Sequence, residues 1–336
     1  MSAPKPLLQI DGLSVEFSAR AGSVSAVDDI SLTLHEGEIL AVVGESGSGK
    51  SVTALSALRL IPDPPGRIVA GSVSLDGIDL AILDEAQMRR IRGKDMAMIF
   101  QDPMSSLNPI LTVGQQIGEA ISLHQGGTKQ DVRDRTLEVL ELVRIPQAEL
   151  RIDQYPHELS GGMRQRIMIA MALSCNPRVL LADEPTTALD VTIQAQILAL
   201  LRDLRARLGT AILLITHDLG VVAENADRVV VMYGGRKVEE GPVEVLIGAP
   251  RHPYTRGLLG SMPNLDRALV PGRQGRLTEI QGSVPINAAR LPGCGFAARC
   301  PFADDHCVAV RPPFVRVGDG HISACWKHNQ LEGIQP

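Results

Sequence analysis

The sequence contains few aromatic residues and no long hydrophobic segment. Of its 336 residues only 3% are aromatic, whereas 44% are hydrophobic, so the core must rest on Leu, Ile, Val, Ala and Met. No run of about 18 apolar residues occurs, and residues 1–6 lack an apolar stretch of signal-peptide length. We therefore expect a globular chain that does not cross a membrane by itself, although a partner can hold it on one.

An excess of positive charge is also missing. The formal net charge of −5 argues against a surface built mainly to bind nucleic-acid phosphates, and no nucleic-acid partner is expected. Cysteine is scarce, with five residues, but four of them lie between positions 294 and 325. In a cytosolic protein such a cluster predicts metal binding rather than disulfides. The fifth, Cys175, is expected in the core.

Short apolar runs alternate with helical patterns up to about residue 248. The runs Ile39–Val43, Val179–Ala182 and Ala211–Ile215 predict buried strands. Between the last two, apolar residues recur at helical spacing, and Gly209 follows as a cap. This order of elements predicts an α/β protein whose parallel sheet is covered by helices.

Two segments depart from the alternation and divide the chain. Residues 102–155 show helical periodicity and little strand signal, so we interpret them as a helical insertion. After about residue 250 the composition shifts towards Pro, Gly, Arg and Cys, which indicates an appended module. The predicted division is a core of residues 1–101 and 156–249, the insertion at 102–155, and a four-cysteine extension at 250–336.

A glycine-rich loop follows the first of these strands. It fits G-x-x-x-x-G-K-[ST] and precedes a helical pattern, which favours a phosphate-binding loop over a chance match. The glycines let backbone N–H groups face phosphates, and the helix N-terminus adds its positive end. Lys50 is expected to reach the β- and γ-phosphates of ATP, and the Ser51 hydroxyl to bind Mg²⁺. The predicted ATP-binding loop comprises Gly44, Glu45, Ser46, Gly47, Ser48, Gly49, Lys50 and Ser51.

Two carboxylates end the strand at Val179–Ala182. Asp183 can hold Mg²⁺ through water, and Glu184 is placed to polarise an attacking water molecule. Taken alone, two acids after a strand are more often a helix N-cap than a catalytic pair. Their combination with the loop at Lys50 favours catalysis.

Ser160, Gly161 and Gly162 precede another helical pattern. They can present N–H groups to an anion, but taken alone they are more often an ordinary Ser N-cap. Together with the loop and the acids, this segment resembles the ATP-binding-cassette (ABC) ATPases, whose LSGGQ signature it matches with Met163 in place of Gln. The resemblance implies an ABC-type P-loop NTPase, with a RecA-like mixed-sheet core, a helical subdomain and here a small Cys-rich C-terminal extension.

The resemblance assigns further site residues. Gln101 matches the Q-loop, which contacts Mg²⁺ or the attacking water and senses the membrane half of a transporter. Residues 188–190 match the D-loop at the dimer interface through Asp190. His217 matches the switch histidine that reaches the γ-phosphate, and Phe17 stands where the family places an aromatic that stacks on adenine. Taken alone, His217 would more often be a core or capping group, and Phe17 a core residue.

In the family that this chain resembles, no single chain holds a complete site. The loop around Lys50 binds ATP, and Ser160–Gly162 of a facing subunit closes over its γ-phosphate before hydrolysis to ADP and phosphate. The implied partner is a homologous ABC ATPase. Met163 indicates that the two sites of such a heterodimer are unequal.

Three further segments, Phe100–Pro109, Gln154–Met163 and Ala249–Thr255, resemble the ATPases of bacterial dipeptide and oligopeptide importers. This likeness implies two transmembrane permeases, an extracytoplasmic peptide-binding protein and a peripheral position on the cytoplasmic face of the inner or plasma membrane. A nickel or other small-solute importer is an alternative. A soluble ABC ATPase of DNA repair or translation is another, but it would generally add a coiled coil or a second cassette.

The four clustered cysteines are Cys294, Cys300, Cys307 and Cys325. Their spacing lacks the tight C-x₂₋₄-C pair that is usual in tetrahedral zinc sites. Four thiolates on a loop-rich module suit a [4Fe–4S] cluster, and the proline after Cys300 occurs in some such sites. The peptide-importer resemblance implies the same cluster. Zn²⁺ or reduced structural thiols are the alternatives.

Overall fold

The computed structural model describes residues 5–19, 22–187, 189–261, 280–285 and 287–331. It contains two compact units, each assembled from separate stretches of the chain. The first unit comprises residues 1–9, 33–39 and 74–215. The second unit comprises residues 10–32, 40–73 and 216–336.

The first unit contains three neighbouring parallel strands, β6 (Met96–Ile99), β7 (Val179–Asp183) and β8 (Ala211–Thr216). Every residue of these strands is buried, and β7 and β8 confirm two of the strands predicted from the apolar runs. In the register of β6 and β7, Ile99 lies opposite Ala182. The carboxyl ends of the two strands therefore meet at one edge of the sheet.

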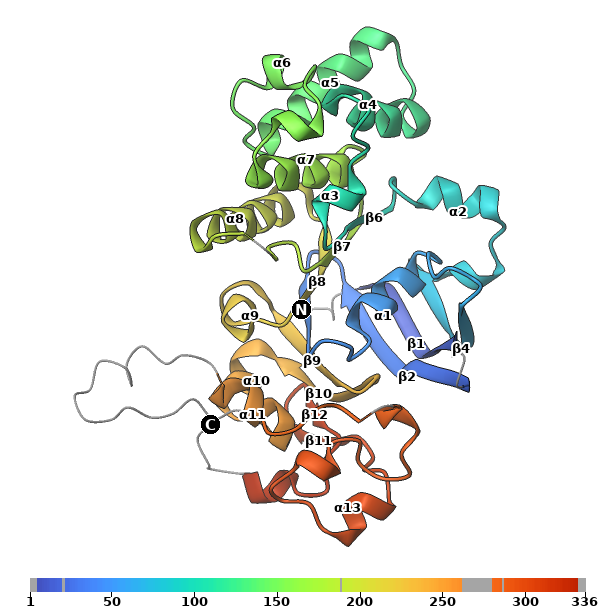
Figure 1. The fold of residues 1–336 in the computed structure, drawn as a ribbon, viewed down its shortest axis with the longest axis vertical. Coiled ribbons are helices and arrows are strands. Elements are labelled where there is room, and N and C mark those ends of the chain that lie inside the picture. The colour runs from blue at the N-terminus through green and yellow to red at the C-terminus, as the bar shows by residue number, and fades with distance from the viewer. Residues whose placement is uncertain (1–4, 20–21, 188, 262–279, 286, 332–336) are drawn as a thin grey trace, which may run out of the picture. The chain divides into compact units, whose positions relative to one another are not determined.

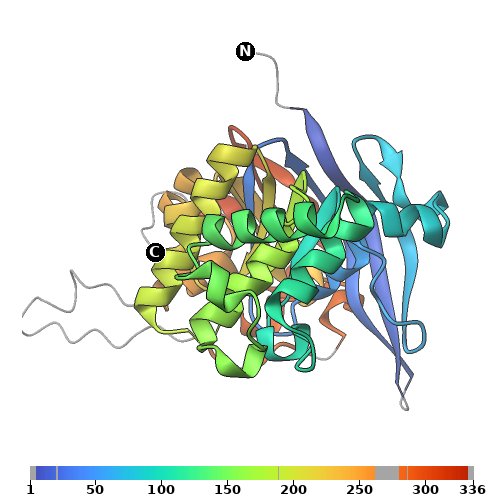
Figure 2. The same ribbon diagram turned by 90° about the horizontal axis from the view of Figure 1, so that it is seen from above.

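A group of helices belongs to the same unit. Helices α4 and α5 pack with each other and with α7, α6 packs with α5, and both views show these four together (Figures 1 and 2). Thr112 and Thr128 start α4 and α5 with capping boxes, in which the hydroxyl and the backbone N–H of each threonine are both bonded. Their bounds are α3 (Pro103–Ser106), α4 (Val113–His124), α5 (Lys129–Leu142), α6 (Ala148–Arg151) and α7 (Gly161–Leu173).

Helix α8 (Val191–Leu208) connects β7 to β8. The Asp190 carboxylate caps its first turn, accepting a hydrogen bond of 2.9 Å from the Ile193 amide. Gly209 ends the helix with a φ of 68°, a left-handed conformation that glycine adopts without a steric penalty. The predicted helix and its glycine cap are confirmed.

The second unit contains a mixed sheet. In it β3 (Ile39–Val43) runs parallel to β9 (Arg228–Tyr233), and β9 is antiparallel to β10 (Arg236–Pro242). The C-terminal extension adds β12 (His321–Ser323), which pairs with β10, and β11 (Val315–Gly318), which pairs with β12. Main-chain hydrogen bonds thus join the extension to the sheet that carries the glycine-rich loop.

The remaining strands and helices are short, apart from the long strands near the N-terminus. The strands are β1 (Pro6–Ala19), β2 (Gly22–His35), β4 (Gly66–Leu75) and β5 (Ile78–Asp79). The helices are α1 (Lys50–Ala57), α2 (Glu85–Ile91), α9 (Leu219–Asn225), α10 (Val243–Gly248), α11 (Pro253–Gly260) and α13 (Asp305–Ala309). Within the described ranges, no helix combines the length and the apolar character needed to span a bilayer.

Candidate nucleotide-binding and catalytic site

The glycine-rich loop joins β3 to α1 in the second unit, and two of its positions require glycine. Gly44 has a φ of 155°, and a Cβ there would lie 2.2 Å from the carbonyl oxygen of Met232. Gly49 has a φ of 96°, and its Cβ would lie 2.6 Å from the carbonyl oxygen of Ala26. A side chain at either position would clash with backbone, so the loop can approach its neighbours only with glycine.

Lys50 is the first residue of α1 and is buried. Its ammonium group donates hydrogen bonds to the carbonyl oxygens of Gly44 and Glu45, at 2.8 and 2.9 Å. The side chain therefore folds across the loop, which brings a fixed positive charge to the N-terminal end of α1. Both the charge and the helix end suit an anion such as a phosphate.

Phe17 and His217 also belong to the second unit. The half-buried Phe17 ring packs on Gly66, where an added Cβ would lie 2.7 Å from Phe17 Cε1. His217 is exposed just after β8, and the following residue, Asp218, caps α9 by accepting a hydrogen bond of 2.8 Å from the Gly220 amide. The stacking of Phe17 on adenine and the contact of His217 with the γ-phosphate stay predictions.

The predicted catalytic carboxylates lie at the end of β7 in the first unit. Asp183 is the last strand residue and is buried, whereas Glu184 is half-buried. Glu184 has a φ of 44°, and its amide donates to the carbonyl oxygen of Ile215 at 2.9 Å. This left-handed conformation is unusual for a residue other than glycine and turns the chain sharply where β7 ends.

Two side chains hold the Glu184 carboxylate. Oε2 accepts hydrogen bonds from Gln101 Nε2 at 2.9 Å and from Thr187 Oγ1 at 2.8 Å. The structure thus brings together Gln101 and Glu184, both predicted to be catalytic. Sequence reasoning did not single out Thr187, whose only signal is its place three residues after the carboxylate.

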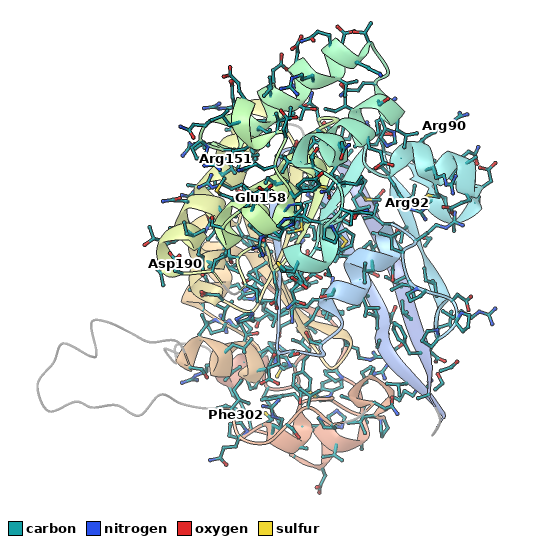
Figure 3. All side chains as sticks on the ribbon, turned by 45° about the horizontal axis from the view of Figure 1, so that its top comes forward. Arg90, Arg92, Arg151, Glu158, Asp190 and Phe302 are labelled. Carbon is teal, nitrogen blue, oxygen red and sulfur yellow. The ribbon has the colours of Figure 1, made fainter. Side chains whose placement is uncertain are left out.

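The predicted signature residues start α7, also in the first unit. Ser160 is the N-cap, and its Oγ accepts a hydrogen bond of 3.3 Å from the Met163 amide. A Cβ on Gly162 would lie 3.2 Å from Ile193, so glycine permits close packing of α7 against the start of α8. Asp190, the N-cap of α8, is exposed (Figure 3). Ala188, in the predicted D-loop, lies outside the described residues.

The signature helix is tied to the segment after the catalytic carboxylates. Gln165 in α7 is buried, and its Nε2 donates to the carbonyl oxygen of Pro185 at 2.5 Å. Since Pro185 follows Glu184 directly, this bond fixes the backbone next to the proposed base. The sequence pattern gave no sign of it, because Gln165 stands between Arg164 and Arg166 as one more polar residue, and its acceptor is a main-chain carbonyl.

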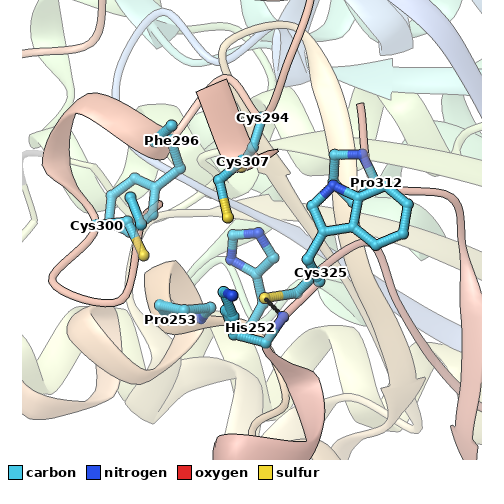
Figure 4. Close-up of a pocket in the computed structure, with 12 residues that line it drawn as sticks. His252, Pro253, Cys294, Phe296, Cys300, Cys307, Pro312 and Cys325 are labelled. Carbon is cyan, nitrogen blue, oxygen red and sulfur yellow. Dashed lines mark hydrogen bonds between the residues drawn. The ribbon is translucent and has the colours of Figure 1, made fainter. Parts of the chain in front are cut away.

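The four clustered cysteines line one cavity, together with His252 and Phe296 (Figure 4). None of the five cysteines of the chain is in a disulfide. Burial raises the pKa of all four thiols, that of Cys300 to about 11 and that of Cys325 to about 12, so they are neutral at pH 7. The cavity measures about 10 Å³, which is room for about one water molecule.

His252 places an unpartnered polar atom at this cavity. The ring is fully buried, its Nδ1 accepts a hydrogen bond of 3.1 Å from the Tyr254 amide, and its Nε2 has no partner. Burial lowers the pKa of His252 to about 3, so the ring is neutral. Because Nδ1 accepts a hydrogen bond, the proton of the neutral ring lies on Nε2. A buried N–H without a partner is costly, which favours a group with acceptor atoms at the cavity.

The types of side chain at this cavity suit a metal ion or cluster, but the spacing between them does not. Four thiols and an imidazole N–H suit an iron–sulfur group, and the Lys327 amide already donates to Cys325 Sγ at 3.3 Å. Among the described residues, however, no three His, Cys, Asp or Glu side chains are grouped so as to hold a metal ion. The thiols would have to move to bind one.

Comparison with known proteins first defines the class. The ABC transporter family matches residues 27–187. The ATP-binding cassette MJ0796, in a dimeric post-hydrolysis state bound to ADP and Pi, superposes with a TM-score of 0.64 at 28% identity, over 70% of this chain and 98% of that one. A second cassette, cbiO1 of Clostridium perfringens, gives a TM-score of 0.61 at 26% identity, over 72% and 90%. The fold and the glycine-rich loop therefore define an ABC ATPase.

The family follows from sequence relatives that span nearly the whole chain. A putative peptide import ATP-binding protein of Brucella abortus (strain 2308) is 53% identical over 97% of this chain and 98% of its own length. A probable peptide ABC transporter ATP-binding protein of Sinorhizobium fredii (strain NBRC 101917 / NGR234) is 52% identical over 98% and 97%. The oligopeptide/dipeptide transporter C-terminal region matches residues 238–307. The chain belongs to the ABC transporter ATP-binding proteins that carry this C-terminal region.

Proposed function

We propose that the chain is the ATP-hydrolysing subunit that drives import of di- or oligopeptides through an ABC transporter. The observation that carries this proposal is the likeness to peptide import ATP-binding proteins over 97% of the chain, including the extension matched at residues 238–307. A nickel or other small-solute importer and a soluble DNA-repair or translation ATPase are not favoured by these relatives.

The proposed nucleotide site centres on the glycine-rich loop. The loop Gly44–Ser51 binds the phosphates of ATP, with Lys50 on the β- and γ-phosphates and Ser51 on Mg²⁺. Asp183 holds Mg²⁺ through water, and Phe17 stacks on adenine. The buried position of Lys50 and its bonds across the loop support this assignment.

Glu184 is the proposed general base. Gln101 orients it and also contacts Mg²⁺ or the attacking water, and His217 reaches the γ-phosphate. The hydrogen bond from Gln101 to Glu184 supports this pairing, because it aims the carboxylate from a neighbouring strand end. The water loses a proton to Glu184 as its oxygen bonds to the γ-phosphorus. The bond from the γ-phosphorus to the β–γ bridging oxygen breaks, its electron pair stays on ADP, and inorganic phosphate is the other product.

Hydrolysis is proposed to require a second, homologous ATPase. Ser160, Gly161 and Gly162 of one subunit close over ATP held by the other, and Asp190 lies at the shared interface. The exposure of Ser160, Gly161 and Asp190 supports such a role. Met163 replaces the usual Gln, so we expect the two sites of the heterodimer to hydrolyse ATP at different rates.

The other proposed partners place the chain at a membrane. Two permease subunits bind it on the cytoplasmic face of the inner or plasma membrane, and an extracytoplasmic binding protein delivers the peptide. In the proposed domain division, residues 1–101 and 156–249 form the nucleotide-binding core and residues 102–155 form the helical subdomain. Residues 250–336 form the extension characteristic of peptide transporters, of which 262–279 and 332–336 lie outside the described residues.

We further propose that Cys294, Cys300, Cys307 and Cys325 hold a [4Fe–4S] cluster, with Zn²⁺ as the alternative. Their shared cavity and the unpartnered Nε2 of His252 support the proposal. When bound, such a group would crosslink the loops of the extension, and its role would be structural. His252 would donate its Nε2 proton to a sulfur atom.

Transport by a reconstituted complex tests the main proposal. The chain, its partner ATPase and the permeases are placed in proteoliposomes, and ATP hydrolysis is measured with binding protein plus a peptide mixture, with binding protein alone, and with Ni²⁺. Stimulation by peptide and uptake of labelled peptide are expected. Stimulation of ATP hydrolysis by Ni²⁺ alone would overturn the peptide assignment. So would a hydrolysis rate that changes with neither peptide nor Ni²⁺.

A further inference from the structure

An ion pair joins the P-loop to the cysteine-rich extension within the second unit. Arg299 Nη1 donates to Glu45 Oε2 at 2.7 Å, and Nη2 donates to Glu45 Oε1 at 3.0 Å. The arginine side chain is only 6% exposed, and its pKa is raised, first of all by these hydrogen bonds to Glu45. Two parallel bonds of this kind fix direction as well as charge.

The extension holds the guanidinium group in place from several sides. Arg299 Nε donates to the Gln281 carbonyl oxygen at 2.9 Å, and Nη2 to the Ile280 carbonyl oxygen at 3.2 Å. The cation also lies 5.8 Å from the ring centre of Tyr233 and 5.9 Å from that of Phe296. Arg299 therefore meets Glu45 as a fixed group and not as a flexible surface side chain.

A second residue of the extension binds the backbone of the same loop position. The buried Tyr254 hydroxyl accepts a hydrogen bond of 2.8 Å from the Glu45 amide. The carbonyl oxygen of Glu45 accepts from Lys50, the lysine expected on the phosphates. Side chain, N–H and C=O of Glu45 are thus all engaged, two of them by the extension.

We propose that Arg299 is a positioning residue for ATP binding. Glu45 puts a negative charge into a loop that must accept a triphosphate, and like charges at this range repel. Arg299 neutralises that charge and turns the carboxylate towards the extension, which leaves the loop and Lys50 for the phosphates. Cys300 follows Arg299 directly, so the contact with the loop and the cysteine site are neighbours in the chain.

Equilibrium binding of a fluorescent ATP analogue with Mg²⁺ to the full chain tests the proposal. Arg299→Ala is expected to weaken binding about tenfold, the size expected when a bidentate charged pair is lost. The double variant Glu45→Gln/Arg299→Ala is expected to recover most of the affinity, because it removes the charge that Arg299 neutralises. A merely structural arginine would not be rescued in this way.

Arg228→Ala provides the matched control. Arg228 forms an ion pair with Glu240 in the same unit, but it lies opposite Leu40, at the end of β3 remote from the loop. Its loss is expected to change nucleotide affinity less than about twofold, because sites without shared partners act nearly independently. Arg299→Lys keeps the charge but not the bidentate guanidinium geometry, so its affinity for the ATP analogue should lie between those of the parent and Arg299→Ala. Adding Glu45→Gln to Arg299→Lys should also restore affinity.

Two outcomes would overturn the proposal: unchanged affinity in Arg299→Ala, or no recovery when Glu45→Gln is added to Arg299→Ala or to Arg299→Lys. Thermal unfolding of each variant shows whether it is folded. If Arg299→Ala is not folded, the comparison of Arg299→Lys with Glu45→Gln/Arg299→Lys decides the test. The proposal rests on ATP binding by the P-loop and not on the cargo. Its failure would leave the peptide assignment untouched, and failed peptide transport would leave this test unaffected.

Discussion

Gln101 and Glu184 are joined by a hydrogen bond of 2.9 Å although they lie 83 positions apart in the chain. Each follows the carboxyl end of a strand, Gln101 after β6 and Glu184 after β7, and these strands are parallel neighbours. The pairing register therefore delivers an amide donor to the carboxylate. This arrangement makes the role of Glu184 directly testable.

Glu184→Gln is expected to bind ATP but to hydrolyse it at least about 100 times more slowly, because an amide cannot take a proton from water. Phosphate release and nucleotide binding are measured side by side. Asp203→Asn is the control, since this carboxylate pairs with Arg144 on the surface of the same unit. Normal hydrolysis by Glu184→Gln would contradict the general-base assignment.

Thr187→Val tests whether aiming the carboxylate matters. The substitution removes the donor to Glu184 Oε2 at nearly constant volume. We expect kcat to fall about tenfold, roughly the value of one charge-assisted hydrogen bond, while the affinity for ATP stays the same. A change in affinity with normal kcat would show that Thr187 acts on binding instead.

Anaerobically purified protein is expected to be brown, with iron and sulfide in equal amounts. Cys300→Ser should remove the colour, whereas Cys175→Ser should keep it, because Cys175 lies in the other unit, buried beside Ser174 and Ala120. Metal analysis and the visible spectrum provide the readout. A colourless preparation with stoichiometric zinc would contradict the cluster and support the zinc alternative.

The acid stability of the chain should depend on Asp76. Hydrogen bonds from Lys5 and Arg178 hold the pKa of this carboxyl below its usual value of 3.8. Since the folded pKa is the lower one, the pair stabilises the protein above pH 3.8 and loses that effect as the pH falls through the folded value. Asp76→Asn should therefore unfold more easily than the parent at pH 6, and the gap should close as the pH falls below 3.8 and through the folded pKa. A gap that is constant with pH would rule out this linkage.

Local patterns in the sequence predicted the elements that depend on local physics. The strand at Val179–Ala182 follows from uninterrupted apolar residues, and the end of α8 follows from Gly209, which alone adopts its backbone conformation freely. The roles of Gln101 and His217 came from family resemblance, because no local pattern distinguishes them from ordinary polar residues. The structure places Gln101 in contact with Glu184, and both roles stay predictions.

Contacts between distant segments could not be predicted. Glu45 and Arg299 are separated by 254 positions, and no sequence motif around either residue predicts their contact. The same holds for Gln165 and the Pro185 carbonyl oxygen, since a backbone acceptor leaves no trace in the sequence. The [4Fe–4S] cluster was predicted from four cysteines. The fold gathers them around one cavity, but side-chain spacing is set by packing that the sequence does not display.

The bond between Arg299 and Glu45 also limits how far the chain can be shortened. A minimal cassette ending at Gly248 would keep every nucleotide-binding motif, yet it would lose Tyr254 and Arg299 and leave the Glu45 carboxylate beside the phosphates. It would also uncover Tyr233, whose ring packs edge-on against Tyr254 and Phe296. In a chain with only five Phe and three Tyr, that cluster is a large share of the aromatic surface. We expect such a fragment to aggregate and to bind ATP poorly. The extension is therefore a structural part of the nucleotide-binding domain.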